Sequence, residues 1–318
     1  MARYGGFVRS ILLSLVLLGC GVEMADDDAE QSFLQQDVTT CAAGTWCVES
    51  APIAPTLLLR SVWAADANSV FAVGDGGTIL RRTNGAWETM ASGTTQTLKM
   101  VHGTSASNVW AVGFSGTALR FDGVSWAPVS VGTTANIQAV WLSSASDIWM
   151  AGPGTIWRST NGGASFTATG KAGSLYSISG TGPNDVWVTG ENANVYRWNG
   201  STWSTVKPTT STTTYYSVLA LATNLVWTAS FYPGKQELRS NGSTWTAVTT
   251  SIFNGTNMSA LSANDIWAVG AAKVGRWNGS AWTVSSPFGT SAVVWSVATV
   301  PGSAWVVGAN GLIAQYAY

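Results

Sequence analysis

The sequence has few charged residues and almost no histidine. Only 10% of its 318 residues are charged, and 15 basic residues against 16 acidic ones leave a net charge of −1. Such a balance offers no basic face for phosphates to bind, which argues against a nucleic-acid partner. Only two cysteines, Cys41 and Cys47, lie beyond the N-terminal targeting segment, and together with one distant histidine they cannot form a structural zinc site. We therefore expect no metal centre, and we expect no cofactor.

The N-terminus lacks an apolar run long enough to span a bilayer as a helix. Arg3 and Arg9 precede an apolar run of only eight residues, 11–18, as in a secretory signal. The run ends in Leu-Leu-Gly-Cys at 17–20, which resembles the lipobox of bacterial lipoproteins. The resemblance implies a signal peptide over 1–19 and a diacylglycerol on Cys20, the first mature residue. The alternatives are an ordinary signal peptide cut nearby or an uncleaved anchor.

Residues 20–40 lack sustained periodicity and are acidic, so we predict a lipidated, flexible tether there. Cys41 and Cys47 follow, and an oxidising compartment favours a disulfide between them, the alternative being two free thiols. We expect a cell-envelope protein held to the membrane by its lipid alone. Gly21 is not the aspartate that retains some lipoproteins at the inner membrane. This favours the outer membrane, facing the periplasm or the cell surface.

An internal repeat dominates residues 41–318. Glycine (35) and tryptophan (18) are abundant, which is typical of short strands joined by tight turns. An aromatic residue recurs seven times at intervals of 38 to 40 residues, in three copies within an aromatic-Ala-Val-Gly run and in the others within a variant of it. Its positions are Phe71, Trp110, Trp149, Trp187, Trp227, Trp267 and Trp305. A period near 40 with strand-forming residues predicts an all-β, seven-bladed propeller of four-stranded antiparallel blades.

The first six units also carry an Asn-Gly or Asp-Gly pair between the third and outer strands, for which we predict a type I′ hairpin. Only six such pairs occur, and the last unit ends at Tyr318 without an outer strand. The segment Gly44–Val48 resembles the outer strand around Trp245. We therefore predict that an N-terminal outer strand containing Trp46 completes the last blade and closes the ring.

The units resemble tectonin repeats, with a Val-Trp-Ala-Val-Gly core followed by Gly-x-Ile-x-Arg and Asn-Gly-x-x-Trp. Residues 159–166 also resemble the Asp-box of sialidase-type propellers, although Asn161 stands where that family has aspartate. These resemblances cover nearly all of 44–318 and imply a propeller fold. They do not fix a function, because propellers include lectins, hydrolases and scaffolds.

Catalytic pairs are missing from the pattern. Asp147, Asp185 and Asp265 occupy equivalent positions, where we expect turn residues that bind their own backbone. One arginine recurs at the same place in most blades, and we expect it to stack on an aromatic ring or pair with a neighbour rather than clamp a substrate. We therefore assign no catalytic residue.

Six tryptophans fall outside the repeat, and a grafted binding site would use such residues. An exposed indole offers a flat apolar face to a sugar or a protein. His102 occupies an inner-strand position and is a polar group near the channel. The candidate ligand-binding residues are Trp63, His102, Trp141, Trp157, Trp198, Trp277 and Trp295. Core packing is the competing interpretation for each tryptophan.

These features favour a non-catalytic binding module, expected to be a monomer, that recognises its ligand at the envelope. The first hypothesis is lectin-like, with a glycan as partner. The alternative is an interaction or assembly scaffold with an envelope protein as partner. A sialidase-like glycoside hydrolase is third, since hydrolysis of a glycosidic bond needs a carboxyl pair or a tyrosine with a carboxylate.

Overall fold

The computed structural model describes residues 42–170, 173–208, 212–230, 237–248 and 257–318. The predicted signal peptide, the tether with Cys20, and Cys41 lie outside the described residues, so lipidation and the disulfide stay predictions. The chain separates into residues 1–35 and 36–318, and all that follows concerns the second unit. In the described part of the chain no helix has the length and apolarity to cross a membrane.

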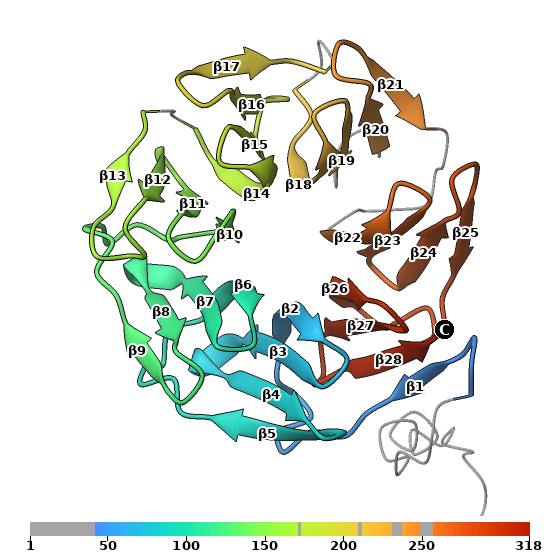
Figure 1. Cartoon of the computed structure of the whole chain (residues 1–318). Helices are drawn as coiled ribbons and strands as arrows, with labels where there is room; N and C mark the ends of the chain where they lie inside the picture. The colour runs from blue at the N-terminus through green and yellow to red at the C-terminus, as the bar shows by residue number, and fades with distance from the viewer. Residues whose placement is uncertain (1–41, 171–172, 209–211, 231–236, 249–256) are drawn as a thin grey trace, which may run out of the picture. The chain divides into compact units, whose positions relative to one another are not determined.

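Seven four-stranded antiparallel sheets follow one another around a ring (Figure 1), confirming the predicted propeller. The inner strand of each blade contacts the inner strand of the next blade. The inner strands are β2 (Leu59–Asp66), β6 (Leu98–Ser105), β10 (Ala139–Leu142), β14 (Leu175–Gly182), β18 (Tyr215–Ala222), β22 (Asn257–Ser262) and β26 (Val294–Val300). The second strands are β3 (Ser69–Gly74), β7 (Asn108–Gly113), β11 (Ile148–Gly152), β15 (Asp185–Gly190), β19 (Leu225–Ser230), β23 (Asp265–Gly270) and β27 (Ser303–Gly308).

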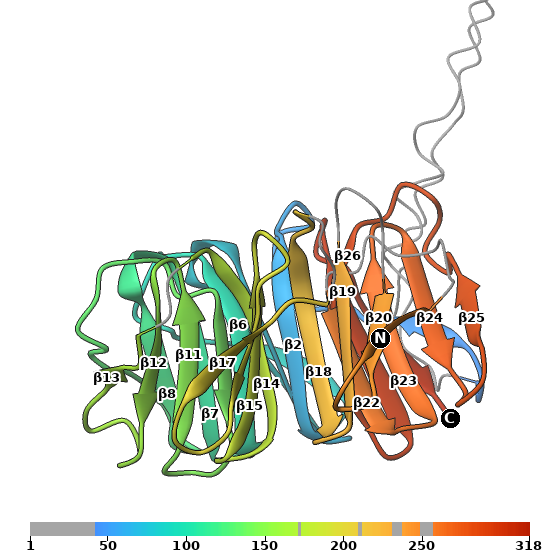
Figure 2. The ribbon, with the colours of Figure 1, turned by 90° about the horizontal axis from the view of Figure 1, so that it is seen from above.

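The two outer positions of each sheet complete the blades. The third strands are β4 (Ile79–Thr83), β8 (Ala118–Phe121), β12 (Thr155–Ser159), β16 (Val195–Trp198), β20 (Glu237–Ser240), β24 (Lys273–Trp277) and β28 (Ile313–Ala317). The outer strands are β5 (Ala86–Met90), β9 (Trp126–Pro128), β13 (Thr167–Ala168), β17 (Trp203–Val206), β21 (Trp245–Val248), β25 (Trp282–Ser285) and β1 (Trp46–Val48). Blades are numbered one to seven from β2 onward. Turned by 90°, the ring shows inner strands that run roughly along its axis (Figure 2).

The N-terminal strand closes the ring, as the missing outer strand of the last unit predicts. β1 pairs antiparallel with β28, with Trp46 opposite Tyr316. Two further backbone bonds flank this ladder, from the Gly44 amide to the Ala317 carbonyl and from the Glu49 amide to the Ile313 carbonyl, both 2.8 Å. The last blade is therefore shared between the two ends of the described chain, and both are held by backbone pairing.

The core consists of clusters between blades. The recurring aromatic residues are almost fully buried, with Trp110, Trp149, Trp227 and Trp305 at 0% exposure. Each packs on the neighbouring sheet; Trp305 of blade seven, for example, packs against Ala72 and Leu80 of blade one. Burying a side chain of this size stabilises the fold by about 2 kcal/mol or more. The repeat spacing thus places one large aromatic in each interface.

Side chains of the inner strands also bridge blades through the backbone. The Ser296 hydroxyl accepts the Val62 amide of blade one at 3.1 Å, and the Ser61 hydroxyl accepts the Val101 amide of blade two at 3.2 Å. The Ser177 hydroxyl accepts the Val218 amide in the same way between blades four and five, and between blades six and seven the Asn257 side-chain oxygen accepts the Val297 amide. These bonds satisfy amides at sheet edges that have no ladder partner.

The predicted turn type is wrong in five of the six hairpins. Only Asn84 and Gly85 both have positive φ, as a type I′ turn requires; in the other pairs the glycine alone does. In blade four, the Asn199 side-chain oxygen instead accepts the amides of Ser201 and Thr202. The asparagine is therefore selected for this capping bond and not for a left-handed backbone.

Candidate functional site

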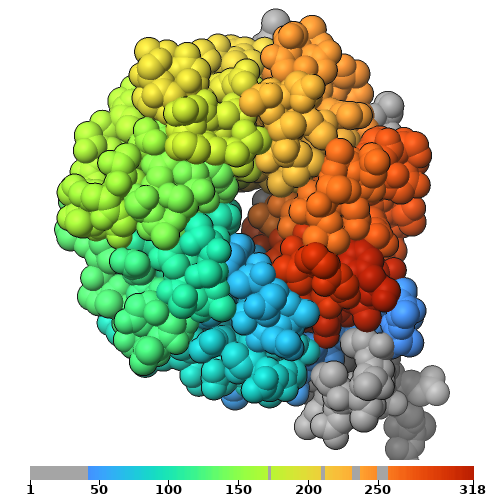
Figure 3. Space-filling model, in the orientation of Figure 1, coloured from blue at the N-terminus to red at the C-terminus, as the bar shows by residue number. Residues whose placement is uncertain are grey.

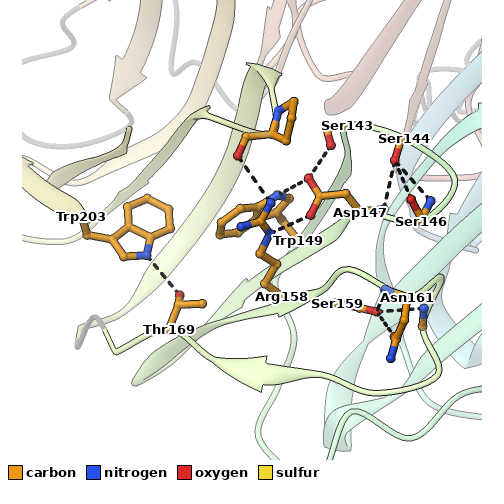
Figure 4. Close-up of polar contacts among 12 residues, drawn as sticks. Ser143, Ser144, Ser146, Asp147, Trp149, Arg158, Ser159, Asn161, Thr169 and Trp203 are labelled. Carbon is orange, nitrogen blue, oxygen red and sulfur yellow. Dashed lines mark hydrogen bonds and ion pairs between the residues drawn. The ribbon is translucent and has the colours of Figure 1, made fainter. Parts of the chain in front are cut away.

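The recurring arginines form a structural network with the recurring aromatics. In blade three, the Arg158 guanidinium stacks over Trp149 at 4.4 Å and its Nε donates to Asp147 at 2.7 Å (Figure 4). Blades four and six repeat this arrangement around Trp187 and Trp267. The expectation that these arginines stack and pair locally is confirmed.

The aspartates preceding the second strands have a different role from the one expected. Asp147 accepts hydrogen bonds from the indole of Trp149 and the hydroxyl of Ser143 in addition to Arg158, and Figure 4 shows these partners converging on its carboxylate. Asp185 accepts from Trp187, Arg197 and Thr181 in the same way. These carboxylates bind side chains and not their own backbone. The correction follows from the cross-strand pairing of the arginine, which the sequence order alone does not show.

His102 is a bridging acceptor in the channel wall. Its Nδ1 accepts the Leu142 amide of blade three at 3.3 Å, as the Ser179 hydroxyl accepts the Ala220 amide two blades on. The rings of Trp63 and Trp141 lie 6.0 and 6.5 Å from the imidazole. Burial lowers the pKa of His102 to about 4, so the imidazole is neutral at pH 7.

Trp63 and Trp141 both line the channel interior, a cavity of about 310 Å³. Each also packs on a glycine of the following blade. A Cβ on Gly103 would lie 2.7 Å from the Trp63 ring, and a Cβ on Gly180 would lie 2.7 Å from the Trp141 ring. These two indoles therefore fill the space above a glycine as well as facing the channel.

The remaining four candidate tryptophans differ in how far they are buried. Trp157 and Trp277 are core residues, with 6% and 7% exposure. Trp198 is partly buried and lies between Trp149 and Trp203, 5.7 and 5.6 Å from their ring centres. Trp295 alone of these four lines an open cavity.

That cavity is the channel mouth at the end where the inner strands begin. Five of its residues are each the extra residue of a β-bulge, because the pairing register skips them between the first and third residues of the inner strand. They are Arg60, Lys99, Tyr176, Tyr216 and Trp295. Gln138 occupies the corresponding place just before β10. Bulges commonly redirect a side chain out of the ladder beside a functional site.

The glycine of the repeat signature makes room for four of these bulges. Gly74 ends the second strand opposite Leu59, and a Cβ there would lie 2.3 Å from the Leu58 carbonyl oxygen. The same clash would arise at Gly113, Gly190 and Gly308. Because the signature glycine has no side chain, the start of the inner strand can lie close against it. This close approach accommodates the bulge whose extra residue, such as Arg60, lines the channel mouth.

One side of the mouth is cationic. Arg60 and Lys99 come from neighbouring blades, and the Arg60 Nε bonds Asp75 at 2.5 Å. Lys99 has no ion pair among the described residues, and its nearest ring partner is Phe114, 5.8 Å from Nζ. Burial, followed by repulsion from Arg60, lowers the pKa of Lys99, while Asp75 acts in the opposite direction. Asp75 therefore pairs with Arg60 and acts on Lys99 only at longer range.

The other side of the mouth is aromatic. The rings of Tyr176 and Tyr216 stack with centres 4.7 Å apart and planes 29° apart. The Tyr176 hydroxyl donates to Glu191 at 2.7 Å. Burial, and then this hydrogen bond to a carboxylate, raise the pKa of Tyr176 to about 12, which keeps the phenol protonated. Trp295 completes the rim next to Arg60, because blades seven and one are neighbours.

The mouth encloses about 380 Å³, within the roughly 300–1,000 Å³ of ligand pockets. The space-filling view shows an opening at the centre of the ring (Figure 3). Cations can pair with a carboxylate, and the stacked rings can cover an apolar or planar group. No cluster of three metal-ligating side chains occurs in the described ranges.

A second hollow of about 450 Å³ lies on the outer part of the ring, between blades six and seven. Its wall includes the rings of Trp46 and Tyr316, the guanidinium of Arg276 and the side chains of Thr283 and Ser285.

Sequence reasoning found one residue of the mouth, Trp295, and missed Arg60, Lys99, Tyr176 and Tyr216. A signal was available: in six of the seven blades the residue two positions before the apolar residue that recurs in the inner strand (Val62, Val101) has a large side chain, and its type is not fixed by the repeat. A position that the repeat does not constrain is where a specific site can be built.

No family model and no curated protein matches the sequence, whereas many solved structures share the fold. One is described as "YCF48 bound to D1 peptide", with a TM-score of 0.72 and 15% identity over 89% of this chain and 100% of that one. The virginiamycin B lyase of Staphylococcus aureus gives 0.76 and 15% identity over 86% and 99%. The WD40 propeller of Doa1 gives 0.70 and 14% over 84% and 94%. At these identities the likeness establishes the propeller fold alone.

Proposed function

We propose that this protein is a non-catalytic binding module that holds a segment of a partner polypeptide at the channel mouth. It is anchored in the cell envelope by a lipid on Cys20 and acts as a monomeric scaffold. The observation that carries the proposal is the set of five bulge residues, two cationic and three aromatic, which line one cavity.

The chemistry of the mouth supports a polypeptide ligand. Cationic and aromatic groups lie side by side, so one segment can place a charged and an apolar side chain against matching surfaces. Among the structures with this fold, one is described with a bound peptide.

Site-specific crosslinking in cells tests the proposal. A photoreactive phenylalanine replaces Gln138 at the mouth, and in a control chain it replaces Thr246, which is exposed on the outer strand β21. We expect an adduct with one defined polypeptide segment from position 138 only. It should disappear when Tyr216 is changed to alanine. Adducts of equal yield and composition from both positions would contradict a mouth-directed scaffold.

Glycan recognition is the second candidate, and the hollow between blades six and seven favours it. Indole and phenol rings there adjoin the hydroxyls of Thr283 and Ser285 and the Arg276 guanidinium, a combination that suits a sugar ring. A glycan array with the full chain tests this function. A hit that Trp46→Ala abolishes and Tyr216→Ala leaves unchanged would support it, and a blank array with folded protein would eliminate it.

A further inference from the structure

We propose that the partner segment is acidic, with a carboxylate seated between Lys99 and Arg60 and an adjoining apolar side chain covering the Tyr176–Tyr216 pair. This inference rests on the proposed function and specifies the ligand class of the same site.

The first argument is the charge at the mouth. Arg60 binds Asp75 through Nε, and no described residue accepts a hydrogen bond from its two terminal nitrogens. Lys99 is partly buried and has no described ion pair. An incoming carboxylate would therefore find an ammonium and the free edge of a guanidinium together, which is the arrangement that gives strong charge-assisted hydrogen bonds.

The second argument is electrostatic relief. Lys99 is disfavoured as a cation by burial and by the neighbouring Arg60, which Asp75 only partly offsets. A second carboxylate at this point would offset that penalty by its attraction for the ammonium, whereas a basic ligand would increase it. The mouth therefore selects an acidic segment against a basic one by repulsion as well as by attraction.

The third argument is geometry. Lys99 and Tyr176 occupy equivalent bulges two blades apart and face the same cavity of about 380 Å³. Gln138 lies between them and offers both an amide donor and an acceptor to a passing backbone. A short extended segment can thus present a carboxylate to one side and an apolar side chain to the other.

The test is a selection from a random peptide library displayed on phage, using the full chain in detergent as bait. Selected peptides are measured against wild type, Tyr216→Ala, Lys99→Gln, Lys99→Arg and Lys207→Gln. Lys207 is exposed and does not line the mouth, so its substitution removes the same charge elsewhere. Thermal unfolding confirms that each variant is folded.

We expect peptides enriched in Asp or Glu beside an aromatic or proline residue. Their affinity should fall at least tenfold in Lys99→Gln and in Tyr216→Ala, remain within about twofold in Lys99→Arg and Lys207→Gln, and decrease with added salt. Peptides that depend on Tyr216 but carry no acidic residue and ignore Lys99→Gln would overturn this inference and leave the proposed function intact. A library that gives no Tyr216-dependent binder would overturn both.

Discussion

At the scale of single residues, His102 acts as a hydrogen-bond acceptor built into the wall between two blades. Its Nδ1 accepts the Leu142 amide, and a protonated imidazole has no lone pair to do so. Serine hydroxyls occupy the same role elsewhere. A lone histidine on an inner strand therefore serves the same structural purpose as the serines that replace it.

The depressed pKa of His102 predicts a pH-dependent stability. The folded-state pKa of about 4 lies below the ordinary 6.5, so the unfolded chain binds the proton more readily. The free energy of unfolding is fully retained above pH 6.5 and falls by up to about 3 kcal/mol as pH drops to 4. Urea unfolding at pH 7.5, 5.5 and 4.5 measures this loss.

His102→Asn isolates the histidine from acid effects on carboxylates. The amide oxygen can accept the Leu142 N–H, and it does not titrate. The variant should lose less stability than wild type between pH 7.5 and 4.5. Equal slopes in the two proteins would show that His102 is not the group responsible.

Gly180 predicts a steric effect with a control in the same strand. A Cβ at Gly180 would lie 2.7 Å from both the Trp141 ring and the Asp185 carbonyl oxygen, whereas a Cβ at Gly182 would meet nothing within 4 Å. Gly180→Ala should lower the free energy of unfolding by about 1–3 kcal/mol. Gly182→Ala should leave it nearly unchanged. Urea titration of the two variants measures the difference, and similar losses would contradict the packing assignment of Trp141.

At the scale of the element, the blades share one arrangement of side chains and differ in whether the buried tryptophan has a hydrogen-bond acceptor. Where an aspartate precedes the second strand, as at Asp147 and Asp185, the indole of the following tryptophan has an acceptor. Blade two has Asn108 instead, and the buried Trp110 indole nitrogen has no described partner. The Arg120 Nε reaches the Asn108 oxygen at 3.3 Å, longer than the bonds to aspartate.

Asn108→Asp should therefore stabilise blade two. The new carboxylate would pair with Arg120, accept from the Trp110 indole and bind the Thr104 hydroxyl, as Asp185 binds Thr181. We expect the free energy of unfolding to rise by about 1 kcal/mol. The reverse change in blade three, Asp147→Asn, should lower it. Thermal and urea unfolding of both variants measure this, and a loss in both would contradict the equivalence of the blades.

At the scale of the whole molecule, ring closure depends on a buried ion pair at the seam between blades seven and one. Glu49 follows the closing strand β1, is 4% exposed, and accepts from the Arg82 guanidinium and the Trp87 indole. The Arg82 guanidinium also lies 5.7 Å from the Trp305 ring centre. The Glu49 side chain, directly after the N-terminal strand, thereby links the last blade to the first through an ion pair and a hydrogen bond.

Glu49→Gln should weaken the whole ring, because it leaves a buried guanidinium without its counter-charge. We expect a loss of about 3 kcal/mol or more in the free energy of unfolding, visible as a lower urea midpoint. Glu88→Gln on the exposed face of β5 removes the same charge and should change little. A similar small effect for both would show that the seam does not depend on this pair.

The sequence by itself determined the number of blades and the closure, because each unit carries its own aromatic, glycine and turn residues at a fixed spacing. The six turns for seven aromatics identified Trp46 as the missing outer strand, since local pairing rules suffice for that inference. Only the tertiary structure brought the residues of the candidate site together. Arg60, Lys99, Tyr176 and Tyr216 are separated by about 40 residues or more along the chain, and they meet because bulges in separate inner strands aim them at one axis. Likewise, whether a tryptophan such as Trp277 is buried or Trp295 faces the cavity depends on the neighbouring blade, which no single repeat encodes.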